Sequence, residues 1–199
     1  MVAVFLLLGA AFVGLEHSSI RRKWQLRPKS EEQVKARDFV KYHAKNFTVA
    51  NVVDGDTIDI DVPDGRYGHT RIRLLGIDAP ETRSQDYGAM YFGAEAGRFA
   101  EELSLGQRVT VYLDEGNPTR GKYGRLLAYV ELPDGSFLNE VLVSEGFAYA
   151  DLRFPHSFYH KYRQLEASAR SLKRGLWQEV SREQLPEWLR ERKPKLLNK

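Results

Sequence analysis

Alternation of apolar and polar residues over residues 47–77 is the feature of this sequence that most constrains its fold. Successive side chains of a β-strand point to opposite faces, so a period of two predicts strands with one buried side and one solvent-facing side. The sequence PDG at residues 63–65 interrupts the alternation, and these residue types are typical of tight turns. The stretch therefore predicts a pair of antiparallel strands or a short meander, and not a helix.

Further helices and strands are expected after this meander. Helical spacing of apolar residues predicts helices over residues 94–105, 137–145 and 157–173, the last closed by Gly175 as a C-terminal cap. Two more strands are expected in the sequences QRVTVYLD and RLLAYVEL, which the polar loop EGNPTRGKYG separates. Five short strands with interleaved helices predict an α+β domain built on a small, closed or partly open barrel.

Length, cysteine content and charge narrow the possible functions. The 199 residues suffice for one domain with a hydrophobic core and flanking segments. The sequence has no cysteine, which excludes disulfides, thiolate metal sites and cysteine nucleophiles, so any metal must have oxygen or histidine ligands. Residues 47–178 hold fifteen Lys and Arg against nineteen Asp and Glu. A phosphate-binding surface on this acidic body must therefore be local.

The N-terminal end differs from this body in composition. Residues 1–15 are almost wholly apolar, are too few to span a bilayer as an ordinary transmembrane helix, and suit the apolar core of a secretory signal. We expect residues 1–20 to be a signal or a membrane anchor, with a buried N-terminal helix as the alternative. The first interpretation predicts a protein that is secreted, or membrane-anchored and facing outside the cytoplasm.

Two segments flank the expected domain of residues 47–178. Residues 21–46 are interpreted as a basic linker with a short helix, at whose start Ser30 and Gln33 have capping-box spacing. The apolar stripe of this helix is thin and consists of Val34, Phe39 and Val40. Residues 179–199 are interpreted as a C-terminal tail that forms a short helix with a frayed basic end.

Acidic side chains stand at the ends of two predicted strands. Asp54 and Asp56 flank a glycine in VVDGDT, and Asp78 and Glu81 lie in IDAPET. Each motif alone is typical of a surface turn or of a strand exit, where Pro80 ends the hydrogen-bond ladder. Taken together, oxygen ligands at strand ends suit a hard cation such as Ca²⁺, which accepts carboxylates and backbone carbonyls in flexible geometry.

An arginine inside an apolar strand favours a functional site over simple surface turns at these strand ends. Arg73 lies five positions before Asp78, and a buried guanidinium without partners is very costly. It either forms an internal salt bridge with the acids or binds a phosphate, which a planar guanidinium contacts in bidentate fashion. Arg125 also stands at the start of an apolar strand. Two arginines facing clustered carboxylates are what metal-assisted phosphodiester cleavage requires.

Several motifs, taken together, resemble one known family. VVDGDTIDI, RIRLLGIDAPET, FGAEA, KYGRLLAYV, DGSFLNEVLVSEGFA and EASARSLKRGLW occur in the order and at about the spacing found in the staphylococcal nuclease, or thermonuclease, family. The resemblance covers roughly residues 47–177. It implies a five-stranded OB-fold β-barrel with three helices. It also implies an endonuclease that cleaves DNA and RNA with Ca²⁺ and leaves 3′-phosphate ends.

The resemblance implies roles for individual residues as well. Asp56 and Asp78 resemble the carboxylate ligands of Ca²⁺, and the backbone carbonyl of Ala79 resembles a third ligand. Glu81 resembles the residue that positions the attacking water, and whether it also acts as a general base stays open.

Further positions resemble residues that contact the substrate. Arg73 and Arg125 resemble the two arginines that contact the scissile phosphate and stabilise its pentacoordinate state. Lys122 and Tyr123 match positions that contact the terminal phosphate or nucleotide, and Phe154 matches one that packs on the base.

The chain departs from the family pattern near the substrate. The family has two tyrosines around the nucleotide base, whereas Leu152 and Phe154 stand at those positions here, and Tyr149 or Tyr159 are candidates to replace the lost ring. The loop after Glu81 has Arg83 as its only cation. Base stacking is worth about 1–3 kcal/mol per base, so these differences predict altered affinity or base preference.

Three functions are consistent with the sequence. The leading one is a monomeric, exported or anchored Ca²⁺-dependent phosphodiesterase that acts on single-stranded or frayed DNA and RNA. The second is a catalytically weak OB-fold module that binds nucleic acid. The third is a scaffold protein at a membrane, which rests only on residues 1–15 and the basic linker.

Overall fold

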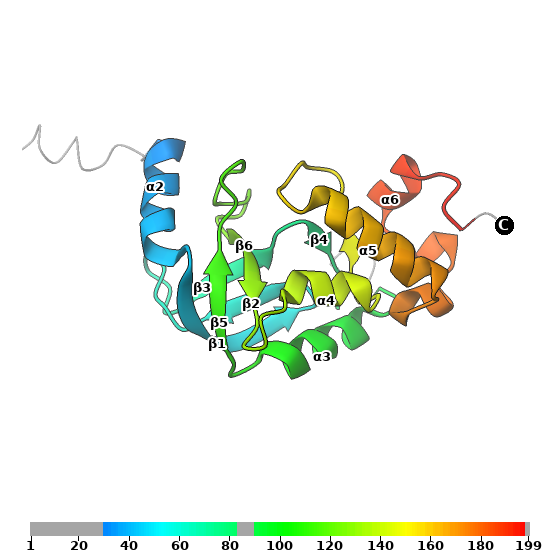
Figure 1. Cartoon of the computed structure of the whole chain (residues 1–199), viewed down its shortest axis with the longest axis horizontal. Coiled ribbons are helices and arrows are strands. Elements are labelled where there is room, and N and C mark those ends of the chain that lie inside the picture. Colours follow the sequence, from blue (N-terminus) through cyan, green and yellow to red (C-terminus); the bar gives the residue numbers. More distant parts are fainter. Residues whose placement is uncertain (1–29, 83–89, 198–199) are drawn as a thin grey trace, which may run out of the picture. The chain divides into compact units, whose positions relative to one another are not determined.

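A computed structural model describes residues 30–82 and 90–197 of the chain (Figure 1). The chain divides into two compact units, residues 1–34 and 35–199. The expected signal or anchor of residues 1–20 lies outside the described residues, as does Arg83. Within the two described ranges, no helix is both long enough and apolar enough to cross a membrane.

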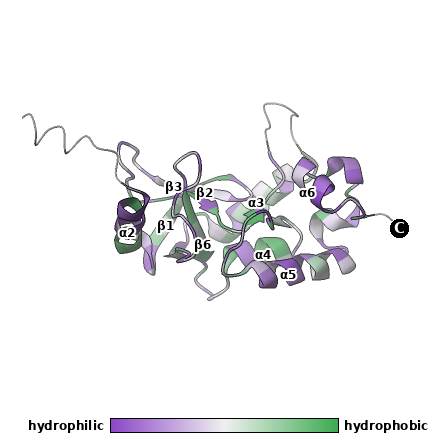
Figure 2. Cartoon of the chain, turned by 90° about the horizontal axis from the view of Figure 1, so that it is seen from above, coloured by the Kyte–Doolittle hydropathy of each residue, from purple (hydrophilic) through white to green (hydrophobic). Residues whose placement is uncertain are grey.

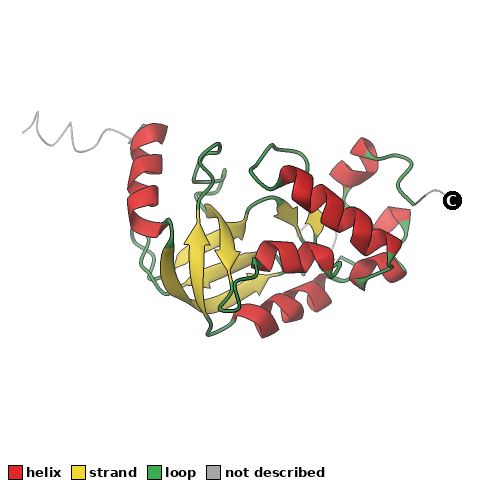
Figure 3. Ribbon diagram, in the orientation of Figure 1, coloured by secondary structure: helices red, strands yellow, loops and turns green. Residues whose placement is uncertain are grey.

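Five strands close into a barrel in the order β1, β2, β3, β6, β5 (Figure 3). They are β1 Lys45–Asp54, β2 Thr57–Ile60, β3 Thr70–Leu74, β5 Arg108–Tyr112 and β6 Leu126–Glu131. Neighbouring strands are antiparallel, except that β3 and β6 run parallel. The structure confirms the predicted α+β fold with a five-stranded OB-fold barrel, and the barrel is closed.

Alternation within the strands separates the barrel interior from its outer face. In β3, Thr70, Ile72 and Leu74 are buried, whereas Arg71 and Arg73 alternate with them on the outer face. Each fully buried Ile or Leu side chain contributes about 1.5–3 kcal/mol to folding. Two register shifts in β1 let its first part pair with β5 and its second part with β2, because such irregularities bend a strand.

Helices lie against this barrel. They are α3 Gly93–Ser104, α4 Leu138–Ser144 and α5 Tyr159–Ser171. Helix α3 contacts β1, while α4 contacts α3, β6 and α5. A separate two-stranded sheet pairs β4, Ile77–Asp78, with β7, Tyr149–Ala150. The three predicted helices are confirmed to within two residues at each end.

The predicted cap of α5 is wrong. Lys173, and not Gly175, takes the left-handed conformation directly after the helix, with a φ of 52°. The N–H of Lys173 donates to the carbonyl of Arg170, and the N–H of Arg174 donates to that of Ala169, which is a Schellman motif. Gly175 instead begins the short 3₁₀-helix η1, Gly175–Gln178.

The helix expected before the domain is confirmed as α2, Glu31–Tyr42, and Phe39 of its predicted apolar stripe packs against the core, but Val40 does not. Val40 is 74% exposed, whereas Asp38 and Tyr42 are fully buried. The hydroxyl of Tyr42 lies 3.0 Å from Thr70 Oγ1 of β3. Residues 38–42 thus belong to the folded body, because a hydrogen-bonded pair of polar side chains anchors the helix to the barrel.

The segment after residue 179 also contacts the body. It contains the 3₁₀-helix η2, Arg182–Gln184, and helix α6, Glu187–Arg192. An apolar cluster joins it to η1 and β7 and includes Tyr149, Trp177, Leu185 and Leu189. Figure 2 shows hydrophilic residues along much of α5 and α6 and hydrophobic ones on α4. Lys193 Nζ lies 2.7 Å from Glu166 Oε2 of α5, so this basic end is held by an ion pair.

Candidate active site

The turn between β1 and β2 places two acidic side chains at the edge of the barrel. The backbone N–H of Asp56 donates to Asp54 Oδ1 over 3.0 Å. Between them, a Cβ atom on Gly55 would lie 2.7 Å from Ala79 Cβ and 2.8 Å from Ala96 Cβ. Any larger residue would push the turn away from the chain after β4 and from α3, so this close approach requires glycine.

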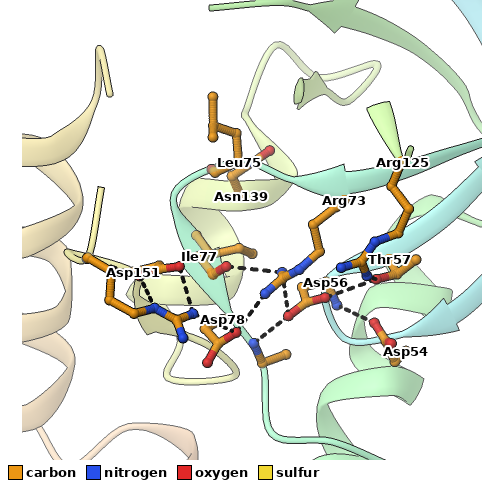
Figure 4. A network of polar contacts seen from close by, with 12 residues as sticks. Asp54, Asp56, Thr57, Arg73, Leu75, Ile77, Asp78, Arg125, Asn139 and Asp151 are labelled. Carbon is orange, nitrogen blue, oxygen red and sulfur yellow. Dashed lines mark hydrogen bonds and ion pairs between the residues drawn. The ribbon is translucent and has the colours of Figure 1, made fainter. Parts of the chain in front are cut away.

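Arg73 lies between two of the acids (Figure 4). Because Ile72 and Leu74 point inward, Arg73 points to the outer face, where 16% of its side chain is exposed. Its guanidinium nitrogens are 2.5 Å from Asp56 Oδ2 and 2.6 Å from Asp78 Oδ1. The internal salt bridge, one of the two interpretations of Arg73, is therefore present, and the phosphate contact stays a prediction.

Asp78 is held from several sides. The amide of Asn139 in α4 donates to the carbonyl of Leu75 over 3.0 Å, which fixes the chain between β3 and β4. Asp78 Oδ2 accepts a hydrogen bond of 2.8 Å from Trp188 Nε1, and Asp78 Oδ1 lies 3.4 Å from Arg153. Sequence reasoning missed both Trp188 and Arg153, because neither stands in a motif near Asp78.

Ala79 and Glu81 follow β4 on a backbone that is closely constrained. The N–H of Ala79 donates to Asp56 Oδ2 over 2.7 Å. The carbonyl of Glu81 accepts a hydrogen bond from the N–H of Met90, and a Cβ on Gly93 would lie 2.4 Å from that carbonyl oxygen. The start of α3 thus fixes the backbone of Glu81, a residue that is exposed to solvent.

The electrostatics of the site reflect an excess of acids. Burial, helped by the charges of Asp54 and Asp78, outweighs the effect of Arg73 and raises the pKa of Asp56 to about 8. The pKa of Glu81 is also raised, because the surrounding chain partly desolvates its carboxyl group although the residue as a whole is exposed, and because the same two acids lie nearby. A raised pKa means that Asp56 and Glu81 hold a proton more readily than isolated carboxyl groups do, so a cation bound here would compete with that proton.

These donors fit a hard cation by type. Asp56, Asp78 and the carbonyl of Ala79 offer oxygen atoms, which Ca²⁺ prefers, and a cation would relieve the repulsion among the acids. In residues 30–82 and 90–197, however, no three His, Cys, Asp or Glu side chains converge on one point at which a metal could bind. Arg73 lies between the two aspartates. Ligation of Ca²⁺ by these residues stays a prediction.

The loop of residues 119–125 carries three further predicted residues. Arg125 Nη1 lies 3.4 Å from Thr57 Oγ1, next to the acids (Figure 4). Tyr123 is 75% exposed, and its ring centroid lies 5.4 Å from Lys122 Nζ and 5.8 Å from the guanidinium carbon of Arg125. A cavity of about 580 Å³ opens beside this loop, and Tyr123 and Arg125 both line it. The structure thus brings Arg125 to the acids and leaves the Tyr123 ring accessible.

A buried ion network that sequence reasoning missed fixes this loop. Arg120 donates to Asp38 Oδ2 over 2.6 Å and to Asp38 Oδ1 over 3.0 Å, and it is also paired with Asp64 in the turn between β2 and β3. Thr119 Oγ1 donates to Asp38 as well, over 2.9 Å. The loop is therefore tied both to α2 and to the β2–β3 turn.

The positions predicted to surround a nucleotide base differ in exposure. Phe154 is 63% exposed, whereas Leu152 is 9% exposed and belongs to the hydrophobic core. Tyr149 is fully buried against Trp177, so the hypothesis that Tyr149 replaces the lost ring is wrong. Of these positions, Phe154 offers an open aromatic face.

Comparisons with known proteins identify the family. A family model described as staphylococcal nuclease homologue matches residues 71–179, more than half of the chain. A thermonuclease of Staphylococcus hyicus is 34% identical over 134 residues, which cover 67% of this chain and 76% of that protein. A thermonuclease of Staphylococcus intermedius is 37% identical over 135 residues, or 67% and 77% of the two chains. An uncharacterized endonuclease of Escherichia coli is 37% identical over 147 residues, or 71% and 81%. The chain therefore belongs to the staphylococcal nuclease family and is a nuclease.

Proposed function

We propose that this nuclease is a Ca²⁺-dependent endonuclease that hydrolyses single-stranded or frayed DNA and RNA and leaves 3′-phosphate ends. The observation that carries the proposal is the position of Arg73 between Asp56 and Asp78, at a site where the acids are in excess. A salt bridge that served stability alone would need no such excess, whereas a cation and a phosphate would both be drawn to this combination of charges.

The two arginines bind and stabilise the phosphate. Among the residues that the structure describes, Arg125 makes only a long hydrogen bond to Thr57, which leaves guanidinium donors available to contact a phosphate oxygen. Arg73 stays paired with Asp56 and Asp78 and contributes positive charge next to the phosphate oxygens. Both charges act most strongly when the phosphorus becomes pentacoordinate and negative charge accumulates on its equatorial oxygens.

Glu81 holds the water that attacks. Its carboxylate accepts a hydrogen bond from the water, whose oxygen forms a bond to phosphorus while the bond from phosphorus to the 5′ oxygen breaks. The proton lost by the attacking water passes to the carboxylate, and the departing 5′ oxygen takes up a proton from a solvent water molecule to become a hydroxyl. The products are a 3′-phosphate end and a 5′-hydroxyl end.

Asp56, Asp78 and the carbonyl of Ala79 would hold the cation. When bound, Ca²⁺ supplies positive charge that polarises the phosphate. Lys122, Tyr123 and Phe154 would contact the nucleotides on either side of the scissile bond. Stacking on exposed rings such as those of Tyr123 and Phe154 requires an unpaired base, which supports the preference for single-stranded or frayed substrates.

Release of acid-soluble nucleotides from single-stranded DNA and RNA, with Ca²⁺ or with EGTA, tests the proposal. We expect cleavage with Ca²⁺ only, and a loss of about 10²–10⁴-fold in kcat for Arg125→Ala, because a charge that acts in the transition state is removed. Arg98→Ala is the matched control, since the Arg98 side chain on α3 is exposed and pairs only with Glu95 among the described residues. Polymerase extension of the products, which should require prior phosphatase treatment, reports the 3′-phosphate.

Two results would overturn the proposal. Cleavage that persists in EGTA would exclude the Ca²⁺ requirement, and products that extend without phosphatase would exclude 3′-phosphate ends. Binding of strands by folded protein without any cleavage would instead favour the catalytically weak binding module.

We also propose that residues 1–15 direct export or membrane attachment, on the basis of their apolar sequence. Cell fractionation of the full chain and of a variant lacking residues 1–20 tests this. Nuclease protein should appear outside the cytoplasm or in the membrane fraction only for the full chain. Equal cytoplasmic retention of both would contradict it.

A further inference from the structure

The C-terminal segment of residues 182–193 reaches the active site. Trp188 in α6 donates its indole N–H to Asp78 Oδ2 over 2.8 Å. The other oxygen of the same carboxylate, Oδ1, accepts a hydrogen bond of 2.6 Å from Arg73 and lies 3.4 Å from Arg153. Both oxygens of Asp78 are therefore held, and the groups that hold them come from three separate parts of the chain.

Trp188 is itself firmly placed. The guanidinium carbon of Arg153 lies 4.5 Å from the centroid of the indole, a cation–π contact. Asp151 accepts two hydrogen bonds of 2.8 Å from that guanidinium, which fixes its plane. Leu189, the next residue in α6, is fully buried, and Arg192 donates to a backbone carbonyl over 2.8 Å. Helix α6 is thus docked by packing and by polar contacts, and the indole N–H is aimed at one atom.

This contact matters because of the carboxylate that receives it. A carboxylate that binds a cation must present its oxygens in a fixed orientation, and its hydrogen-bond partners supply that orientation. We propose that Trp188 is a positioning residue of the nuclease, whose indole N–H orients the Asp78 carboxylate and makes the C-terminal segment part of the active site. The proposal rests on the proposed Ca²⁺-dependent function.

The segment lies outside the part of the chain that the family model matches, which ends at residue 179. The hydrogen bond from Trp188 to Asp78 therefore comes from a segment that the family model does not cover. Arg153 contacts both Asp78 and Trp188, so it also links the C-terminal segment to the acidic site.

The test compares two tryptophans in the same apolar cluster. Trp188→Phe removes the N–H and keeps an aromatic ring, and Trp177→Phe makes the same change where the indole nitrogen has no hydrogen-bond partner among the described residues. Calorimetric titration with Ca²⁺ and steady-state cleavage of single-stranded DNA are measured on the full chain. We expect Trp188→Phe to bind Ca²⁺ about tenfold more weakly and to lose about tenfold in kcat, with KM for DNA unchanged. Trp177→Phe should change the melting temperature alone.

The outcomes separate this inference from the proposed function. If wild type binds Ca²⁺ and cleaves DNA, and Trp188→Phe matches Trp177→Phe in both respects, the inference alone is overturned. Tighter Ca²⁺ binding by Trp188→Phe would also overturn it, because the indole would then compete with the cation. A wild-type protein that neither binds Ca²⁺ nor cleaves would overturn the proposed function and the inference together.

A second measurement keeps the inference testable if Trp188→Phe does not fold. In ¹⁵N NMR spectra of the wild-type protein, the Nε1–H resonance of Trp188 should shift when Ca²⁺ is added, whereas that of Trp177 should not. Absence of any shift at Trp188 during a titration that saturates the protein would contradict the proposed positioning role.

Discussion

Arg73 and Arg120 each lie between two aspartates, yet the two clusters differ in charge balance. In the Arg120 cluster, burial raises the pKa of Asp38, but hydrogen bonds from Arg120, Arg37 and Thr119 outweigh burial and hold that pKa below its usual value. In the Arg73 cluster, burial and neighbouring acids raise the pKa of Asp56 to about 8. Ion pairs of similar geometry thus leave the two carboxyl groups with pKa values shifted in opposite directions.

The difference comes from the neighbours of each pair. Both aspartates accept hydrogen bonds from donors besides their arginine, but Asp56 also has the acids Asp54 and Asp78 beside it. The geometry of an ion pair therefore does not by itself distinguish a stabilising contact from a functional one, and the surrounding charges do. The Arg120 cluster fixes the loop of residues 119–125 to the fold, whereas the Arg73 cluster belongs to the site at which we propose that a cation binds.

Glu81→Gln should produce the largest effect and should act on activity alone. The substitution removes the carboxylate that, in the proposed mechanism, takes the proton from water, so we expect kcat to fall by about 10²–10⁴-fold, with the melting temperature unchanged because Glu81 is exposed. Steady-state cleavage of single-stranded DNA measures it, with the exposed Glu95→Gln as control. Activity close to wild type would remove Glu81 from the catalytic group.

The two ion clusters should respond differently to neutralisation of one aspartate. Asp38→Asn breaks a satisfied buried pair and should lower the free energy of unfolding by about 3–5 kcal/mol. Asp56→Asn also loses a contact with Arg73 but relieves repulsion among acids, so it should cost at most about 1 kcal/mol. Urea denaturation of both variants in EGTA measures these values. Equal losses would show that the two clusters do not differ in charge balance.

A third carboxylate, Asp114, shows whether neutral donors alone can satisfy a buried acid. Burial raises its pKa, but the N–H of Ser157 and the hydroxyl of Tyr129, each at 2.8 Å, together with Asn117, lower it to about 2. A lowered folded-state pKa gives stability that is present above pH 4 and is lost as pH falls towards 2, here about 2 kcal/mol. The free energy of unfolding of wild type and of Asp114→Asn, measured by urea denaturation between pH 6 and 2, tests this. The variant should lose less stability than wild type over that range, and parallel curves would contradict the assignment.

Phe154→Ala should have the smallest effect. Loss of an exposed stacking face should raise KM for single-stranded DNA about fivefold, or about 1 kcal/mol, and should change KM for duplex DNA less. Leu172→Ala, at a residue that is 59% exposed, is the control for loss of exposed apolar surface. Equal changes on single-stranded and duplex DNA would remove Phe154 from base contact.

The sequence predicted those parts of the fold and site that depend on local pattern. Alternation in β3 places Arg73 on the outer face, and the strand ends place Asp56 and Asp78 beside it. The ends of the helices were also predictable, because the apolar spacing and the capping residues that mark a helix end lie within a few residues of it along the sequence. The exception was Lys173, where the hydrogen bonds of the Schellman motif outweighed the preference for glycine in a left-handed conformation.

Contacts between distant segments could not be predicted from pattern. Asp38 and Arg120 are 82 residues apart, and Asp78 and Trp188 are 110 apart. Each of these residues has an ordinary surface interpretation when it is read alone. The same limit explains Val40, which a helical stripe predicted to be buried, because tertiary packing selected Tyr42 and the polar Asp38 instead.

The contact between Trp188 and Asp78 also sets an order of events in synthesis. A growing chain makes the barrel and all the residues that the family model matches before it makes Trp188. Asp78 therefore acquires its third donor only after residue 188 has been synthesised. A ribosome-bound fragment that ends at residue 179 would carry the barrel strands, yet its acidic site would still lack one of its partners.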